Sequence, residues 1–181
     1  MPFEVKTERL VIRSSVPADA AALSRGRSTD FVLRYNLYKK STAEDYTAEL
    51  DSAQECCREY FSVLPLNGVE PIGSVVLSED SLRYHVDSVS VEAWLREDAA
   101  GLGYMTEALS AVLRELFTVR GRERVSCQVM VENIASLRMV EKLGFVREGT
   151  LRGAVRTYDG AIHDVVLFSL SREEFLRSSG A

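Results

Sequence analysis

The stretch NIASLRMVEKLGF, residues 133–145, carries the most information about the fold of this chain. Asn133 is a typical helix N-cap, and Gly144 supplies the left-handed residue with which helices commonly end. The apolar residues between them recur at helical spacing. This spacing predicts a helix with one buried face, made of Ile134, Leu137, Val140 and Leu143.

Ser136 is the one member of this stretch that a helix does not explain. A serine in the first turn adds nothing to helix propensity. Together with Asn133, it places a hydroxyl and an amide beside backbone N–H groups that the helix leaves unpaired. The start of this helix is therefore a candidate ligand-binding site.

Length and composition limit the class of protein. The chain has 181 residues, 46% of them apolar, so it can bury one good core but is short for two independent domains. We therefore expect a single domain over residues 1–181.

The net charge of −5 gives no general attraction for nucleic acid or for an acidic membrane surface. No apolar run approaches the ~20 residues of a membrane span, and the first residues lack the apolar core of a signal peptide, which favours a cytoplasmic protein.

The cysteines and histidines form no disulfide or metal pattern. Cys56, Cys57 and Cys127 are odd in number and contain no CxxC pair, so we expect buried thiols. The two histidines, His85 and His163, lie far apart in the sequence. Metal catalysis is therefore not expected, and no metal ligand is assigned.

Local patterns predict strands and helices in alternation along the chain. Asn67 and Gly68 are the strongest turn signal and predict a hairpin, and Ser171 with Glu174 predicts a cap for a short last helix. Strands are expected at residues 9–14, 60–64, 71–77, 83–95 and 124–131 and on both sides of a turn at Asp159 and Gly160. Helices are expected at residues 17–23, 42–57 and 103–119 and after Asn133. These elements predict one mixed sheet with helices on its faces, an α/β (α+β) class.

A second motif, REDAAGLGYMTEAL at residues 96–109, lies between a predicted strand and a predicted helix. Gly101 and Gly103 leave the turn without side chains, and the unpaired N–H groups at the helix start suit a pyrophosphate. The glycines could equally serve only a tight turn. A dinucleotide fingerprint would have a third glycine where this chain has Thr106, and a P-loop would have a lysine followed by serine or threonine. Both patterns are absent from this motif. The buried face of the helix is expected to contain Met105, Ala108, Leu109, Val112, Leu113 and Leu116.

The order of strand, GLGYMTEAL, helix, strand and NIASLRMVEKLGF resembles the GNAT acetyltransferases. The forms GxGYxTEA and NxxSxRxxEKLGF are similar to the branch that acetylates the N-termini of ribosomal proteins (Rim-type). TERLVIRSS, IGSVVL and REGTLRGAVRTYDGAIHDVVLFSLSREEF also resemble that branch, so the similarity covers nearly the whole chain.

The resemblance implies a mixed, mostly antiparallel sheet of about seven strands, flanked by helices on both faces. The sheet would be splayed open between two central parallel strands, residues 83–95 and 124–131, with acetyl-CoA in the gap. Arg138 would reach the adenosine phosphate, and Asn133 and Ser136 would lie beside the pantetheine and its sulfur. The pantetheine would pair with the strand near Trp94, Leu95 and Arg96, and the pyrophosphate would be held by Gly101, Leu102, Gly103, Tyr104, Met105 and Thr106.

The implied reaction is direct attack of a neutral primary amine on the thioester. A backbone N–H near Trp94 or Leu95 would stabilise the oxyanion. Val140 stands where many members carry a tyrosine acid, so Ser136 becomes the candidate donor to the leaving thiolate.

The general base is not carried over from the family. Val155 stands where some relatives carry a glutamate, and Glu92, on the strand beside the gap, is the candidate base. Glu92 could instead be an ordinary exposed or ion-paired carboxylate, with water removing the proton. Asp98 replaces the arginine or glutamine usual at the head of the pyrophosphate loop, which removes a side-chain phosphate contact there.

Three functional hypotheses follow. The first is an N-acetyltransferase whose acceptor is a protein N-terminal α-amino group. The second is acetylation of a small amine such as an antibiotic, a polyamine or an amino-acid derivative, and the irregular aromatic segment 30–40 would decide between these two. The third is a non-catalytic acyl-CoA-binding module. In every case we expect no nucleic-acid or membrane partner, and a homodimer is compatible with the sequence.

Overall fold

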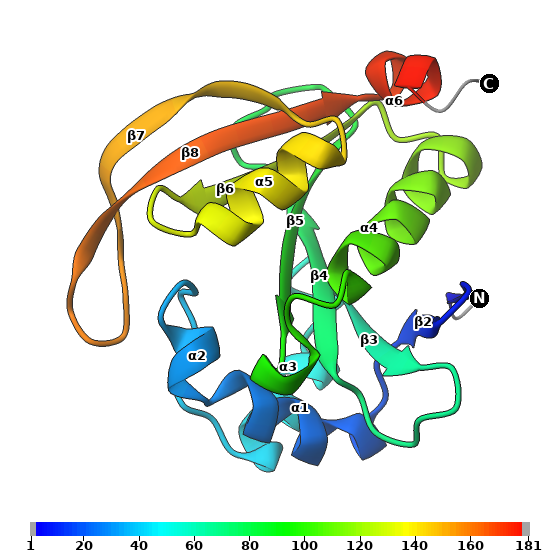
Figure 1. Cartoon of the computed structure of the whole chain (residues 1–181), viewed down its shortest axis with the longest axis vertical. Coiled ribbons are helices and arrows are strands. Elements are labelled where there is room, and N and C mark those ends of the chain that lie inside the picture. Colours follow the sequence, from blue (N-terminus) through cyan, green and yellow to red (C-terminus); the bar gives the residue numbers. More distant parts are fainter. Residues whose placement is uncertain (1–2, 179–181) are drawn as a thin grey trace.

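Eight strands form one mixed sheet in the computed structural model, which describes residues 3–178 (Figure 1). The strand order is β1-β2-β3-β4-β5-β6-β8-β7. The strands are β1 (Glu4–Lys6), β2 (Leu10–Ser14), β3 (Glu59–Pro65), β4 (Gly73–Glu79), β5 (Ser88–Leu95), β6 (Arg124–Met130), β7 (Val146–Arg156) and β8 (Ile162–Ser171). The α-helices are α1 (Ala20–Arg27), α2 (Asp30–Leu33), α3 (Ala43–Asp51), α4 (Tyr104–Arg114), α5 (Ile134–Lys142) and α6 (Arg172–Ser178).

The sheet opens between β5 and β6. Every other neighbouring pair is antiparallel, whereas β5 and β6 are parallel and pair only from Ser88 with Arg124 to Ser90 with Ser126. β5 continues to Leu95 and β6 to Met130 beyond that short contact. The predicted splayed sheet is confirmed. It has one strand more than expected, because the short segment β1 pairs with β2 at one end of the sheet.

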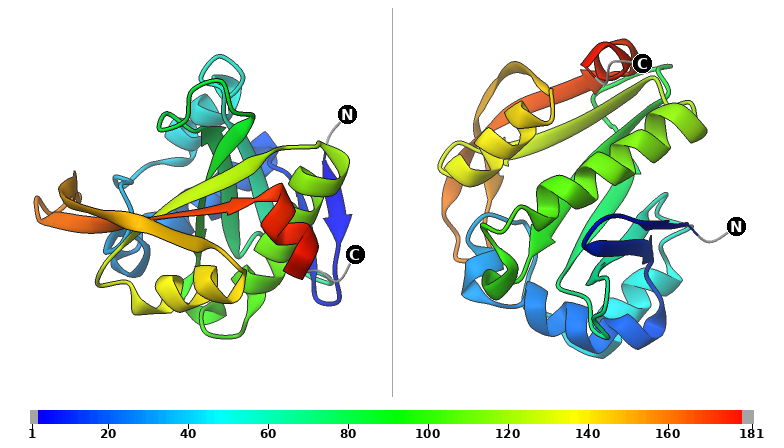
Figure 2. Two further views of the ribbon diagram at one scale, coloured as in Figure 1. Left: turned by 90° about the horizontal axis from the view of Figure 1, so that it is seen from above. Right: turned by 45° about the vertical axis from the view of Figure 1, so that its right-hand side comes forward.

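Helices cover both faces of the sheet, as predicted (Figure 2). Side chains alternate across a strand, so β5 contributes Val91 to the core beneath α4 and Trp94 to a second core beneath α1 and α3. A Cβ on Gly26 of α1 would lie 3.0 Å from the Trp94 ring, which shows how closely this helix packs on β5.

Helix α4 buries the predicted face, and its residues Met105, Ala108, Leu109, Val112 and Leu113 are all buried. The helical stretch continues to Val119, as expected, but its last five residues form a π-helical turn, Glu115–Val119. Leu116, within that turn, is also buried.

Helix α5 has the predicted ends. The Asn133 side chain accepts a hydrogen bond from the Ser136 backbone N–H at 3.2 Å, and Gly144 has φ of 90°. Val140 is 4% exposed and belongs to the main core. Ile134 was wrongly included in the buried stripe, since it is the first helical residue and is 51% exposed.

Some predicted boundaries are corrected. The strand predicted to begin at residue 83 begins at Ser88, because the preceding loop contains His85 at φ of 57°. The helix predicted for residues 42–57 ends at Asp51, and the chain then turns on the surface. Cys56 and Cys57 lie in these turns and are exposed, which corrects the prediction of buried thiols, whereas Cys127 is buried.

Other predicted boundaries agree closely with the structure. The segment predicted as a helix over residues 17–23 begins as a 3₁₀ turn, Pro17–Asp19, and continues as α1. The hairpin at Asn67 and Gly68 is confirmed, because β3 and β4 pair on either side of it. No helix within residues 3–178 is long and apolar enough to cross a membrane.

Candidate active site

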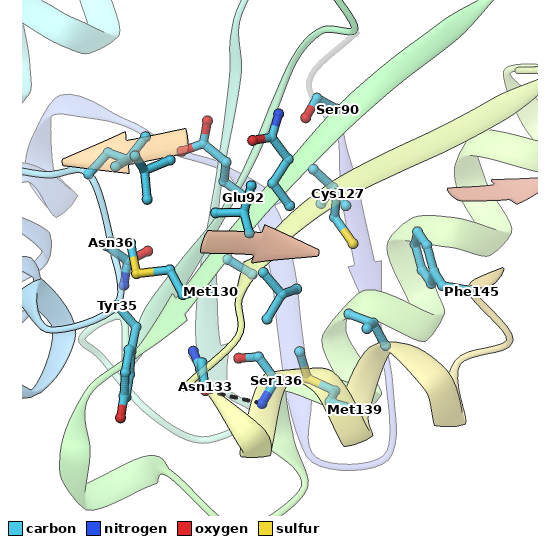
Figure 3. A pocket seen from close by; sticks show the side chains of 18 of the residues that line it. Tyr35, Asn36, Ser90, Glu92, Cys127, Met130, Asn133, Ser136, Met139 and Phe145 are labelled. Atoms are coloured by element: carbon cyan, nitrogen blue, oxygen red, sulfur yellow. Dashed lines mark hydrogen bonds between the residues drawn. The ribbon is translucent and has the colours of Figure 1, made fainter. Parts of the chain in front are cut away.

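A cavity of about 210 Å³ lies where β5 and β6 diverge, and it passes through the sheet (Figure 3). The alternation of side chains divides its lining into two halves. The α5-side half, on the face covered by α4 and α5, includes Ala93, Leu109, Cys127, Ser136, Val140 and Phe145. The α2-side half, on the opposite face, includes Tyr35, Leu37, Glu92, Met130, Val155 and Val165.

The closed end of the gap is fastened by a buried carboxylate. Asp80, which follows β4, accepts hydrogen bonds from Ser88 of β5 at 2.7 Å and from Ser126 of β6 at 2.5 Å. Burial would raise the pKa of Asp80, but the hydrogen bonds from Ser126, Ser88 and the Leu82 N–H outweigh it and leave the pKa below its usual value. The two strands are therefore tied together where they still pair and are free to diverge beyond.

The start of α5 places Asn133 and Ser136 on the α5-side half of the cavity. The Asn133 side chain caps the helix by accepting from the Ser136 N–H. Ser136 is half-buried, and within residues 3–178 its hydroxyl has no hydrogen-bond partner. Its hydroxyl is therefore available to a ligand in the gap.

Glu92 lines the α2-side half and is held by two neighbours. The Tyr38 hydroxyl donates to its carboxylate at 3.0 Å, and an Arg58 nitrogen lies 4.0 Å from its other oxygen. Burial, followed by the charge of Glu92, raises the pKa of Tyr38 well above its usual value. Tyr38 therefore remains a hydrogen-bond donor at neutral pH and orients Glu92.

Tyr38 is itself fixed by a buried arginine. Arg27, 3% exposed, makes two 2.7 Å hydrogen bonds to the Glu49 carboxylate of α3. Its guanidinium lies 4.9 Å from the centre of the Tyr38 ring and 4.6 Å from that of Tyr46. Charge pairing and ring stacking thus connect α1, α3 and the segment that carries Tyr38.

The aromatic segment that was expected to distinguish acceptors reaches the cavity. Tyr35, Asn36 and Leu37, which follow α2, line the α2-side half. The Asn36 side chain donates to the Val32 carbonyl at 2.7 Å, which ties the segment to the end of α2.

The glycine loop leads into α4 beside the cavity. Gly101 and Gly103 have φ of 75° and 81°, values that only glycine adopts readily, and a Cβ on Gly101 would meet no atom within 4 Å. Backbone conformation, rather than crowding by protein atoms, therefore accounts for both glycines. The first N–H groups of α4, on Tyr104, Met105 and Thr106, have no partner within the helix. None of these loop residues lines the cavity itself, but Leu109 on the next turn of α4 does.

Arg9 contacts this loop, and sequence reasoning missed it. Its guanidinium donates to Glu107 at 2.7 Å and to the Leu102 carbonyl at 3.0 Å, and it lies 4.6 Å from the centre of the Tyr104 ring. Arg9 precedes β2 and is more than ninety residues away in the chain, so no local pattern could have indicated it.

The other predicted cofactor residues are distributed around the strand end. The Arg96 guanidinium makes hydrogen bonds of 3.0 and 2.7 Å to Asp98, so the arginine is neutralised by the very residue that departs from the family pattern. The Trp94 side chain is buried beneath α1, and the Arg138 side chain is exposed. Neither residue lines the cavity.

The backbone N–H groups of Trp94 and Leu95, the two positions predicted for an oxyanion donor, point in opposite directions. The Arg96 N–H donates to the Ile72 carbonyl on the β4 side. Successive N–H groups of a strand point to opposite sides, so the N–H of Leu95 points into the gap that β6 leaves.

No cluster of three or more histidine, cysteine, aspartate or glutamate side chains able to hold a metal occurs in the part of the chain that the structure describes. The lining and the loop both suit a thioester of CoA. The gap is lined by apolar and polar side chains in similar measure, and the loop offers free N–H groups beside an arginine.

Comparison with known proteins agrees with this geometry. A family model described as Acetyltransferase (GNAT) domain matches residues 9–146. The SPbeta prophage-derived uncharacterized N-acetyltransferase YokL of Bacillus subtilis is 38% identical over 84 residues, and the match spans 46% of this chain and about half (47%) of that relative.

Two solved structures show the same fold at low identity. The ribosomal-protein-S5-alanine acetyltransferase of Vibrio fischeri is 21% identical, with a TM-score of 0.84 over 96% of this chain and 98% of that one. The spermidine N-acetyltransferase of Vibrio cholerae, in complex with CoA and spermine, is also 21% identical, with a TM-score of 0.81 over 94% and 99% of the two chains. The chain therefore belongs to the GNAT acetyltransferase family and is an N-acetyltransferase that uses acetyl-CoA.

Proposed function

We propose that the acceptor is the α-amino group of a protein N-terminus. The observation that carries this proposal is the charge of the cavity: among the described residues that line it, Glu92 alone is charged. One carboxylate among apolar and neutral side chains suits one ammonium group followed by an uncharged residue. A polyamine carries several positive charges, and these would require several carboxylates.

The rim of the α2-side half supports the same acceptor. Leu37, Met130 and Val155 offer apolar contacts, while Tyr35 and Asn36 offer polar groups. Such a surface suits the first side chains of a peptide. The similarity to the ribosomal-protein-S5-alanine acetyltransferase agrees with this choice, whereas the similarity to the spermidine enzyme keeps a small polyamine as the second candidate.

In the proposed reaction the two faces of the sheet have separate tasks. Glu92 accepts a proton from the ammonium on the α2 side, so that the amine nitrogen can bond to the acyl carbon. The Leu95 N–H stabilises the oxyanion. The carbon–sulfur bond then breaks, the Ser136 hydroxyl donates its proton to the leaving sulfur, and the second proton of the nitrogen passes to water, through which Ser136 is reprotonated. The products are an amide and free CoA.

The remaining residues are proposed to hold the cosubstrate. Gly101, Leu102 and Gly103, with the first-turn N–H groups of Tyr104, Met105 and Thr106, would bind the pyrophosphate. Arg9 keeps that loop in place through its bonds to Leu102 and Glu107. Asn133 would lie beside the pantetheine, the backbone near Trp94 and Arg96 would flank it, and Arg138 would reach the adenosine phosphate.

The test is an acceptor panel in which thiol release from acetyl-CoA is measured. Short peptides with a free N-terminus and an uncharged first residue are expected to be acetylated with a higher kcat/KM than spermidine. The same peptides blocked at the N-terminus serve as the control and should give no thiol. Turnover of spermidine that exceeds turnover of every peptide would overturn the proposal.

Glu92→Gln tests the proposed base. This change is expected to lower kcat by roughly 10²–10⁴ while acetyl-CoA affinity stays the same, because only proton removal is lost. Glu141→Gln, on the exposed side of α5, is the matched control and should leave kcat unchanged. An undiminished kcat in Glu92→Gln would assign proton removal to water.

A further inference from the structure

The α5-side half of the cavity extends beyond the position proposed for the thioester. Ser136 and Val140 lie on one face of α5, four residues apart, which is about 6 Å along a helix. Both line the cavity, and Phe145, after the end of the helix, lines it further on. The lining of the cavity therefore follows α5 from Ser136 to Phe145.

The wall of this extension is apolar and buried. Leu109, Val140 and Phe145 are 4%, 4% and 6% exposed, and each belongs to the main core. Cys127, which also lines the cavity, is buried, and burial raises the pKa of its thiol to about 12, so the thiol stays neutral. A wall of this kind favours hydrocarbon over water.

Val140 limits the room in this part of the cavity. A valine ends at its γ carbons, whereas a larger side chain at this position would extend into the cavity that Val140 lines. The whole cavity has a volume of about 210 Å³, and an apolar cavity of about 150 Å³ can hold a benzene molecule, so an acetyl group leaves room here for a few more carbons.

We propose that the chain accepts acyl groups longer than acetyl, of the length of butyryl, and that Val140 determines this donor preference. The proposal rests on the proposed acyl transfer for its catalytic meaning, but acyl-CoA binding alone can test it. Burial of each added methylene is expected to raise affinity about fourfold, so butyryl-CoA should bind on the order of tenfold more tightly than acetyl-CoA.

The experiment is calorimetric titration of the full chain with CoA, acetyl-CoA and butyryl-CoA, without an acceptor. Val140→Phe is expected to abolish the butyryl preference and to leave CoA affinity unchanged. Val155→Phe is the matched control, because it fills the α2-side half and should keep the preference. If Val140→Phe does not fold, Val140→Leu supplies a smaller filling and should reduce the preference in the same direction.

Two results would overturn the proposal. One is equal affinity of the unaltered chain for acetyl-CoA and butyryl-CoA, and the other is a butyryl preference that survives in a folded Val140 variant. Failure of the peptide acceptor would leave this binding preference in place. Loss of the preference would leave peptide acetylation in place, so the two proposals fail separately.

Discussion

Gly73 is the position at which the smallest change should produce the largest structural effect. It begins β4 opposite Leu95, and a Cβ built on it would lie 2.3 Å from the Trp94 carbonyl oxygen. To reach even 3.0 Å, that carbonyl must retreat by about 0.7 Å, and it is backbone rather than the flexible end of a side chain. We therefore expect Gly73→Ala to lower the free energy of unfolding by about 1–3 kcal/mol.

The same displacement should reach the chemistry. Trp94 precedes Leu95, whose N–H is the proposed oxyanion donor, and a shift of about 1 Å in a catalytic group can cost roughly 10²-fold in rate. For a chain of this size, the loss of stability corresponds to a fall in Tm of about 2–12 °C. Thermal unfolding by circular dichroism and kcat/KM from thiol release measure the two effects.

Gly149→Ala is the matched control for this prediction. Gly149 lies in β7, and a Cβ there would meet no atom within 4 Å, so the variant should stay within about 0.5 kcal/mol of the unaltered chain. If Gly73→Ala unfolds and turns over like Gly149→Ala, the close contact between β4 and β5 does not constrain the site, and the reasoning is refuted.

Three further predictions concern other parts of the site. Ser136→Ala should lower kcat with little change in acetyl-CoA affinity, and an unchanged kcat would remove its hydroxyl from the reaction. Gly103→Leu should weaken the binding of acetyl-CoA, measured by titration. Gly121→Leu is the control and should bind normally, because Gly121 has a similar φ, 71° against 81° for Gly103. Equal affinities of the two variants would refute the pyrophosphate site. Asp80→Asn should lower the free energy of unfolding by about 1.5–3 kcal/mol at neutral pH.

The last of these predictions has a defined pH dependence. The pKa of Asp80 in the folded chain lies below its unfolded value, so its carboxylate contributes stability above the unfolded pKa, and that contribution is lost as pH falls through the folded pKa. The difference in stability between the unaltered chain and Asp80→Asn should therefore shrink below about pH 4. A difference that persists in denaturant unfolding at low pH would count against this role.

Local patterns explain what could be predicted from sequence. The buried face of α4 and the cap of α5 depend on residues within one or two helical turns, and both were found where the spacing indicated. Ile134 was misjudged because the same spacing does not show how far the first helical turn extends beyond the core. The two exposed cysteines were misjudged because the helix before them was expected to run too long.

The contacts that organise the site join distant parts of the chain. The bond from Tyr38 to Glu92 spans 54 residues, and that from Arg9 to Leu102 spans 93. Residue types and spacing indicated Glu92 only as a carboxylate on a strand beside the gap. The tyrosine that orients it, and the division of the cavity between two faces of the sheet, follow from tertiary packing that no local pattern encodes.

The short pairing between β5 and β6 has a consequence for the stability of the whole molecule. Five strands lie on one side of it and three on the other, and among the described residues β5 and β6 pair at only three positions, beside the hydrogen bonds of Asp80. A CoA thioester bound between the leaves would touch both, so its binding energy adds to the free energy of unfolding, by about 2.7 kcal/mol at a hundred times the Kd. The concentration of acyl-CoA around the chain would thus help to set how firmly its two leaves hold together.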